Sequence, residues 1–229
     1  MESLYNGFTL DTPAGTFPLS TDSMLLADFI RLPRNARVLD LGSGCGTLGI
    51  LLCAKDSTCT VTGYEIDPLS HNAAQDNICR NRLNAHISSI CAPIQAVSRD
   101  MKAGSIDVCI SNPPYFSGGA ASAQTPYARR NDFCPTEDLF SNAAWALRFG
   151  GDFYLVHKPE NLGLLCACAS RHQMEAKKLC LVRHHPESSV AMILLQFRKG
   201  GKPGLTWEEL CLYDAAGKPT PDYRRIYHI

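Results

Sequence analysis

The sequence predicts an α/β fold in which a mostly parallel sheet is covered by helices on both faces. Short apolar runs typical of buried strands alternate with helical segments, a glycine-rich turn follows the first run, and two long apolar runs close the pattern. The 229 residues contain no internal repeat and no clear linker. We therefore expect one domain over residues 1–229, made of a lead-in and helix (1–35), a core (36–199) and a tail (200–229).

Each predicted element depends on a local signal. The segment "STDSMLLADFIRL" (20–32) is amphipathic and begins with residues that cap helices, Ser20 or Thr21. Asp67 with Pro68 favours the start of another helix, and the acidic residues after Thr136 favour the first turn of a third. In the tail, only "TWEEL" (206–210) has a helical pattern. Further helices are predicted over 47–55 and 161–172, and strands within 36–46, 59–68, 85–94, 105–111, 150–159, 177–185 and 190–200.

Charge and cysteine content exclude several classes of protein. The formal charge is zero, with 22 Lys plus Arg against 22 Asp plus Glu, so any contact with nucleic acid has to be local. The eleven cysteines include no C-x-x-C pair and fall mostly in apolar runs, which is typical of buried reduced thiols. The segment "MESLYNGFTLDTPAG" has no signal-peptide character, and no apolar stretch reaches the ~18 to 20 residues of a membrane span. We expect a cytoplasmic protein without membrane or metal partners.

The turn after the first predicted strand has the composition of a cofactor site. Its glycines let the backbone approach a ligand, and the next helix points free N–H groups at the same space. Glu65 ends the neighbouring strand about twenty residues later, where an acidic side chain accepts hydrogen bonds from ribose. Asp40 suits an amino-bearing ligand better than a pyrophosphate, which favours S-adenosylmethionine over a dinucleotide. A tight turn without a ligand is the alternative. The predicted cofactor-binding residues are Asp40, Gly42, Ser43, Gly44, Gly46, Glu65, Ile66 and Asn112.

The stretch "SIDVCISNPPYFSGG" (105–119) places a stiff polar segment after a buried strand. Pro113 and Pro114 each fix φ near −65° and donate no backbone hydrogen bond, and Asn112 is biased toward an extended conformation because a proline follows it. Such a segment holds a side-chain amide and a backbone carbonyl in fixed directions at the end of a sheet, where they can contact a ligand. A structural turn between two elements is the alternative.

These segments resemble those of a known enzyme family. "VLDLGSGCGTLGILL", "GYEIDP" and "SIDVCISNPPYF" are similar to the cofactor turn, ribose acid and catalytic motif of class I S-adenosylmethionine-dependent methyltransferases. N-P-P-Y is the variant of enzymes that methylate planar amino or amide nitrogens. "FPLSTDSMLLADFI", "YARRNDFCPTEDLF", "RKGGKPGL" and "LYDAAGKPTPDY" resemble the tRNA-valine (adenine-N6)-methyltransferase family, which extends the similarity over nearly the whole chain.

The resemblance implies both an architecture and a reaction. The architecture is a Rossmann-like three-layer sandwich with a mostly parallel seven-stranded sheet and a closing antiparallel strand. The reaction is methyl transfer from S-adenosylmethionine to the exocyclic N6 amine of an adenine in tRNA, with valine tRNA and the adenine beside the anticodon as the expected target.

The N-P-P-Y residues have a chemical reason to act on such an amine. Its lone pair is delocalised into the ring, so the nitrogen is a poor nucleophile. The Asn112 side-chain carbonyl and the Pro113 backbone carbonyl would each accept one N–H, which favours a pyramidal nitrogen with its lone pair toward the methyl group. Tyr115 would stack on the base. The predicted catalytic residues are Asn112, Pro113 and Tyr115, and the predicted substrate-binding residues are Pro114, Tyr115, Phe116, Arg129 and Arg130.

Two alternative functions share these motifs. N-P-P-Y also serves the methylation of a glutamine side-chain amide in release factors, by enzymes whose helical amino-terminal domain is longer than residues 1–35. The other alternative is an inactive module that binds S-adenosylmethionine or RNA, against which the complete set of motif residues argues.

The chain departs from the family pattern at two places. "CAPI" (91–94) lacks the usual acidic residue near the adenine of the cofactor, so we expect backbone groups and apolar packing there. After "AR", Arg130 and Asn131 stand where the family often shows a histidine and an acidic residue. A set of cations is either an RNA-contacting face or ordinary solvated charge: Lys199, Lys202, Arg129, Arg130, Arg224 and Arg225.

Overall fold

The computed structural model describes residues 1–113 and 136–229, and within them strands and helices alternate as predicted. The strands are β1 (Glu2–Ser3), β2 (Thr9–Leu10), β3 (Arg37–Leu41), β4 (Thr60–Glu65), β5 (Ile87–Cys91), β6 (Ile106–Ser111), β7 (Leu147–His157), β8 (Met174–Arg183), β9 (Val190–Lys199) and β10 (Thr206–Cys211). The helices are α1 (Thr21–Phe29), α2 (Thr47–Lys55), α3 (Pro68–Arg80), α4 (Val97–Asp100), α5 (Thr136–Ala146), α6 (Leu162–Arg171) and α7 (Pro221–Tyr227).

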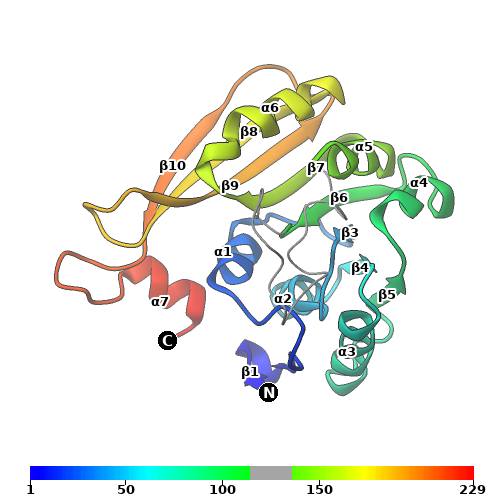
Figure 1. The fold of residues 1–229 in the computed structure, drawn as a ribbon, viewed down its shortest axis with the longest axis horizontal. Coiled ribbons are helices and arrows are strands. Elements are labelled where there is room, and N and C mark those ends of the chain that lie inside the picture. The colour runs from blue at the N-terminus through cyan, green and yellow to red at the C-terminus, as the bar shows by residue number, and fades with distance from the viewer. Residues whose placement is uncertain (114–135) are drawn as a thin grey trace.

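The centre of the molecule is an eight-stranded sheet (Figure 1). Its strand order is β10-β8-β9-β7-β6-β3-β4-β5, and β9 is antiparallel to both of its neighbours while the other neighbouring pairs are parallel. The order reverses at β3, whose carboxyl end lies between those of β4 and β6. Ligands of open α/β sheets bind at such a switch point. The predicted class of fold, including the closing antiparallel strand, is confirmed.

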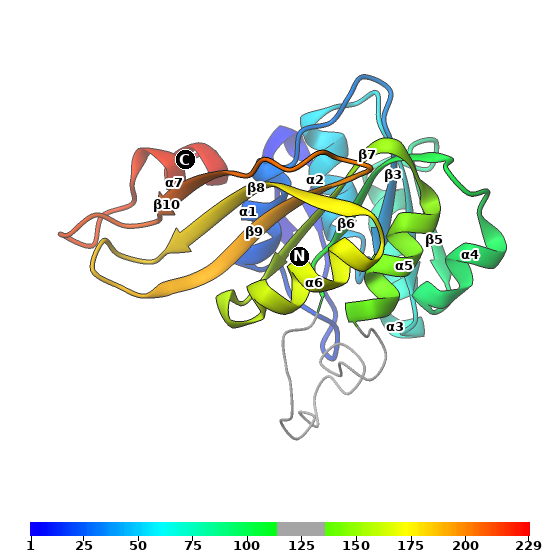
Figure 2. The ribbon, with the colours of Figure 1, turned by 90° about the horizontal axis from the view of Figure 1, so that it is seen from above.

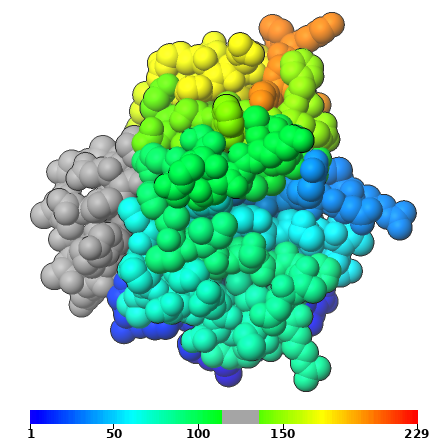
Figure 3. All heavy atoms as spheres, turned by 90° about the vertical axis from the view of Figure 1, so that its right-hand side faces the viewer, coloured from blue at the N-terminus to red at the C-terminus, as the bar shows by residue number. Residues whose placement is uncertain are grey.

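Helices cover both faces of this sheet (Figures 1 and 2). One face packs against α1, α2 and α3 and the other against α4, α5 and α6. Figure 3, which looks toward the β5 edge, shows α3 in cyan on one side and α4 and α5 in green on the other. The side chains of β7 alternate between the two cores, since Phe153 belongs to the cluster under α5 and Tyr154 to the cluster under α1.

The tail contains the main difference between prediction and structure. "TWEEL" forms β10, which pairs in parallel with β8 and adds an eighth strand to the seven expected. Five residues form a stable helix poorly by themselves, whereas a strand here gains a ladder of hydrogen bonds with β8. Cross-strand ion pairs support that register: Lys178 Nζ lies 2.9 Å from Glu208 and Arg183 Nε lies 3.6 Å from Glu209.

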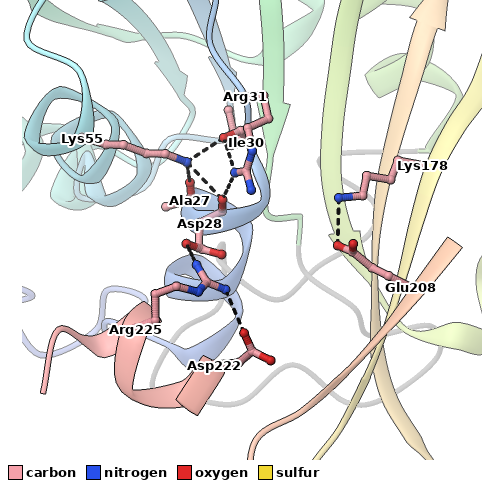
Figure 4. Close-up of polar contacts among 9 residues, drawn as sticks. All are labelled: Ala27, Asp28, Ile30, Arg31, Lys55, Lys178, Glu208, Asp222 and Arg225. Atoms are coloured by element: carbon pink, nitrogen blue, oxygen red, sulfur yellow. Dashed lines mark hydrogen bonds and ion pairs between the residues drawn. The ribbon is translucent and has the colours of Figure 1, made fainter. Parts of the chain in front are cut away.

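Three charged side chains hold the carboxyl end of α1, and one of them, Arg31, donates from Nη1 to the carbonyl oxygens of Asp28 and Ile30 (Figure 4). Lys55 Nζ, in the last turn of α2, donates to the carbonyl oxygens of Ala27, Asp28 and Ile30 at 3.0, 3.0 and 2.6 Å. These are carbonyls that a helix end leaves without intrahelical partners. Arg225 of α7 pairs with the Asp28 carboxylate from the other side. The position of α1 is therefore fixed by both α2 and α7.

Replacing Lys55 with methionine is expected to lower the free energy of unfolding by about 1 to 3 kcal/mol. Methionine keeps the apolar stem but removes the charged donor of the Ala27 carbonyl oxygen, while the carbonyl oxygens of Asp28 and Ile30 keep Arg31. Urea denaturation measures the difference, with the exposed Lys102→Met as the matched control. Equal midpoints for the two variants would show that water and Arg31 satisfy these carbonyls as well as Lys55 does.

The remaining sequence expectations concern thiols and membranes. All ten cysteines in the described part of the chain are free thiols, and six of them are buried: Cys45, Cys53, Cys59, Cys109, Cys168 and Cys180. Within residues 1–113 and 136–229, no helix has the length and apolar character needed to span a membrane.

Candidate active site

The glycine turn between β3 and α2 has the geometry of a ligand cradle. Gly42, Gly44 and Gly46 have φ values of 78°, 54° and 82°, in the left-handed region that favours glycine. The backbone N–H groups of Gly42 and Ser43 donate to the Tyr64 carbonyl oxygen at 2.9 and 3.0 Å, which ties the turn to β4. A Cβ atom at Gly42 or Gly44 would meet nothing within 4 Å, so open space lies beside the backbone there.

Glu65, at the end of β4, is held in place by this turn. Its Oε2 accepts a hydrogen bond from Gly44 N–H and its Oε1 one from Asp67 N–H, both at 2.8 Å. Burial raises the pKa of Glu65, and these two hydrogen bonds oppose the rise. A carboxylate offers about four lone-pair sites, so the fixed side chain keeps acceptor capacity for ribose hydroxyls.

Asp40 is the most unusual polar group of the described chain. It is 1% exposed, and its Oδ1 has no hydrogen-bond partner among the described residues, as is also true of Ser43 Oγ and Tyr64 OH. Burial, reinforced by the negative charge of Glu65, raises the pKa of Asp40 to about 8. A buried carboxyl of this kind calls for a cationic donor. The α-ammonium group of S-adenosylmethionine is such a donor, so these residues fit the predicted cofactor.

The N-P-P-Y motif begins where β6 ends, beside the cofactor turn. Ser111 Oγ donates to the Leu41 carbonyl oxygen at 2.7 Å, which joins the carboxyl ends of β6 and β3. The next residue, Asn112, donates from Nδ2 to Ser23 Oγ of α1 at 3.0 Å. Asn112 is half-buried and Pro113 is buried. Three elements therefore meet at Asn112: β3, β6 and the amino end of α1.

The structure brings the predicted cofactor residues together. Asp40, Gly42, Ser43, Gly44, Gly46, Glu65, Ile66 and Asn112 all lie at the carboxyl ends of the adjacent strands β3, β4 and β6. The predicted positions Pro114, Tyr115, Phe116, Arg129 and Arg130 lie outside the described residues. Sequence reasoning missed Ser23 and Ser111, because nothing in the sequence indicates that Ser23 contacts a residue 89 positions away.

Two members of the predicted basic set have partners inside the protein. Lys199 Nζ donates to the carbonyl oxygens of Ala144 and Leu147 at 2.6 and 2.8 Å, and Arg225 pairs with Asp28. Both are thereby used to hold helices rather than to form a solvated face. Arg224 and Lys202 are exposed.

Replacing Glu65 with alanine is expected to weaken S-adenosylmethionine binding by roughly 1.5 to 3 kcal/mol, the size of a lost hydrogen bond to a charged group. Titration calorimetry measures the affinity, with the exposed Glu187→Ala as the control and circular dichroism to show that the fold is kept. An unchanged affinity would move the ribose contact to another residue.

The fold and this site together define an S-adenosylmethionine-dependent methyltransferase. The family described as methyltransferase small domain matches residues 15–164. The chain belongs to this family. Groups of three or more His, Cys, Asp or Glu that could hold a metal ion are absent from the described residues.

Curated relatives and solved structures agree with this family. Two relatives are named tRNA1(Val) (adenine(37)-N6)-methyltransferase. The one from Photobacterium profundum is 26% identical over 92% of this chain and 90% of its own, and the one from Shewanella halifaxensis is 30% identical over 76% and 70%. Among solved structures, a predicted O-methyltransferase from Agrobacterium tumefaciens has a TM-score of 0.76 at 22% identity, covering 91% of this chain and 96% of its own.

A second solved structure shows the same fold with ligands. It is the T. thermophilus 16S rRNA N2 G1207 methyltransferase in complex with AdoMet and guanosine. Its TM-score is 0.60 at 24% identity, and the alignment covers 87% of this chain and 49% of that one. The predicted fold class, cofactor and reaction type are confirmed by these comparisons.

Proposed function

We propose that this methyltransferase acts in the cytoplasm on the exocyclic N6 amine of an adenine in tRNA, with valine tRNA and the adenine beside the anticodon as its target. The observation that carries the proposal is the junction of Asn112 with the cofactor turn, made through the 2.7 Å hydrogen bond from Ser111 Oγ to the Leu41 carbonyl. It supports a site where a planar nitrogen is held beside a methyl donor.

The chain's own groups position the amine. Asn112 Oδ1 and the Pro113 carbonyl oxygen each accept one N–H of the amine, which turns its lone pair away from the ring and stabilises the positive charge that develops on the nitrogen. S-adenosylmethionine bound at the glycine turn would supply the methyl group: the amine lone pair would form the new N–C bond as the C–S bond breaks, and the sulfur would keep the bonding pair. The product nitrogen loses its proton to solvent, so no general base is needed. Tyr115 is assigned the stacking contact with the base.

The curated relatives favour adenine in tRNA over a protein amide. The relatives cited above carry that substrate in their names, and one of them aligns with 92% of this chain. An unpaired base of an anticodon loop is displaced from its stack at low cost, which suits a site that reads a single base at the carboxyl ends of strands.

Transfer of a labelled methyl group from S-adenosylmethionine tests the proposal. Bulk tRNA, total protein and purified release factor are offered in parallel, and the modified nucleosides are identified by mass spectrometry. We expect N6-methyladenosine in tRNA, and its absence from one position of valine tRNA in cells that lack the gene. Label in protein but not in RNA would assign the amide reaction instead, and label in neither would contradict both.

A further inference from the structure

We propose that Ser23 is a positioning residue that sets the orientation of the Asn112 amide for methyl transfer. The inference rests on the proposed function, because it concerns the group that holds the target amine. Ser23 lies in the first turn of α1, is 4% exposed, and accepts the hydrogen bond from Asn112 Nδ2 at 3.0 Å.

The orientation of this amide decides whether it can act. The two ends of an asparagine amide have nearly the same shape but opposite hydrogen-bonding character, since Oδ1 accepts and Nδ2 donates. An amine N–H facing Nδ2 would meet another donor. A group that holds Nδ2 fixes Oδ1 at the other end of the planar amide as the acceptor. The Ser23 hydroxyl holds Nδ2 in this way.

A hydroxyl both donates and accepts. Ser23 therefore selects the Nδ2 end of the Asn112 amide only if its own proton points away from Asn112. Ser20 Oγ is the acceptor that we assign to this proton. Its Oγ caps α1 by accepting Ser23 N–H at 3.3 Å, and the two hydroxyl oxygens are also 3.3 Å apart. When Ser23 donates its proton to Ser20 Oγ, the lone pairs of Ser23 are left for Asn112. In this assignment the hydrogen bonds run in one direction, from Asn112 Nδ2 to Ser23 Oγ and from Ser23 to Ser20 Oγ.

The support of α1 makes this contact persistent. Lys55 and Arg225 hold the carboxyl end of the helix, and Tyr227 OH is 3.0 Å from Thr21 Oγ1 at its amino end. The helix that carries Ser23 is therefore fixed at both ends, so the hydroxyl stays where Asn112 needs it.

Kinetics of Ser23→Ala and Ser23→Thr test the proposal. We expect Ser23→Ala to lower the single-turnover rate on saturating tRNA about tenfold, the scale of one orienting hydrogen bond, with the affinity for S-adenosylmethionine and the melting temperature nearly unchanged. Threonine keeps the hydroxyl and should restore most of the rate. A rate for Ser23→Ala within twofold of the wild type would overturn the proposal, as would a loss explained by lower cofactor affinity or a lower melting temperature.

A second measurement needs no substrate. The side-chain amide signals of Asn112 in a ¹⁵N NMR spectrum are identified by their loss in Asn112→Ala. We expect slow hydrogen exchange for this pair in the wild type and exchange at least several-fold faster in Ser23→Ala. Equal exchange in the two proteins would refute the contact. If the wild type methylates no RNA while the exchange result holds, the proposed substrate fails and the orientation of Asn112 by Ser23 stands.

Discussion

Replacing Asn112 with alanine is expected to remove most methyl transfer while lowering the affinity for S-adenosylmethionine far less. The hydrogen bond from the amine to Asn112 Oδ1 strengthens as positive charge develops on the nitrogen, so its loss raises the barrier more than it weakens binding. A fall of about 10²-fold or more in the single-turnover rate is the scale for one preorganised polar group. Rapid-quench transfer of labelled methyl measures the rate, and calorimetry measures the cofactor affinity.

Variants at two other positions make this result interpretable. Asn84 is exposed and away from the site, so Asn84→Ala should behave as the wild type. At Tyr115 we expect Tyr115→Phe to be mild and Tyr115→Ala to be severe, because stacking needs the ring and not the hydroxyl. Near-normal turnover of Asn112→Ala would make N-P-P-Y a structural turn, and the mechanism proposed above would then be wrong.

The cofactor half of the site was predictable because its signals are local. The glycines at 42, 44 and 46 need positive φ to reverse the chain, and the structure gives them that conformation. Asp67 caps α3 by accepting the backbone N–H of Ser70 at 3.0 Å, as expected for its position before Pro68. Parallel pairing of β3 with β4 then places Asp40 and Glu65 at one edge.

The parts that were not predictable depend on contacts between distant residues. A cation such as Arg225 in a polar tail is typical of an RNA contact. Its partner in the structure is Asp28, which is 197 positions away in the sequence and could not be foreseen from local pattern. "TWEEL" is neither a good helix nor a good strand alone, and pairing with β8 decides its structure. The contact of Ser23 with Asn112 is of the same kind. Composition and spacing report local structure, whereas these pairings arise only from the folded topology.

Replacing Asp40 with asparagine is expected to weaken cofactor binding and stabilise the free protein at neutral pH. The carboxylate is the partner we assign to the α-ammonium group, and loss of a charge-assisted hydrogen bond there costs roughly 1.5 to 3 kcal/mol or more. In the free protein the same carboxyl is buried with no hydrogen bond to Oδ1 from the described residues. At neutral pH folding must either bury the negative charge of this carboxylate or bind a proton to it, and an isosteric neutral amide removes that electrostatic cost.

The pKa of Asp40 fixes the direction of both pH dependences. Folding raises the pKa from its ordinary value of 3.8 to about 8, so between these values the folded chain holds a proton that the unfolded chain has lost. The protonated Asp40 carboxyl therefore contributes most to the free energy of unfolding below pH 3.8. This contribution falls as the pH rises toward 8, with a slope of up to about 1.4 kcal/mol per pH unit. The unfolding free energies of the wild type and Asp40→Asn should therefore diverge by up to about 1.4 kcal/mol per pH unit, or about 2.7 kcal/mol in all, as the pH is raised from about 5 to about 7.

Cofactor binding should follow the opposite trend. The ammonium group pairs with the ionised carboxylate, so binding below pH 8 releases the proton of Asp40, and affinity should rise toward pH 8 by up to about tenfold per unit. Calorimetry in buffers of different ionisation enthalpy counts that proton. Asp40→Asn should release none, and the exposed Asp76→Asn should match the wild type. A flat affinity from pH 6 to 8, with no proton released by the wild type, would mean that Asp40 does not receive the ammonium group. Asp40 Oδ1, which has no partner among the described residues, would then need another ligand.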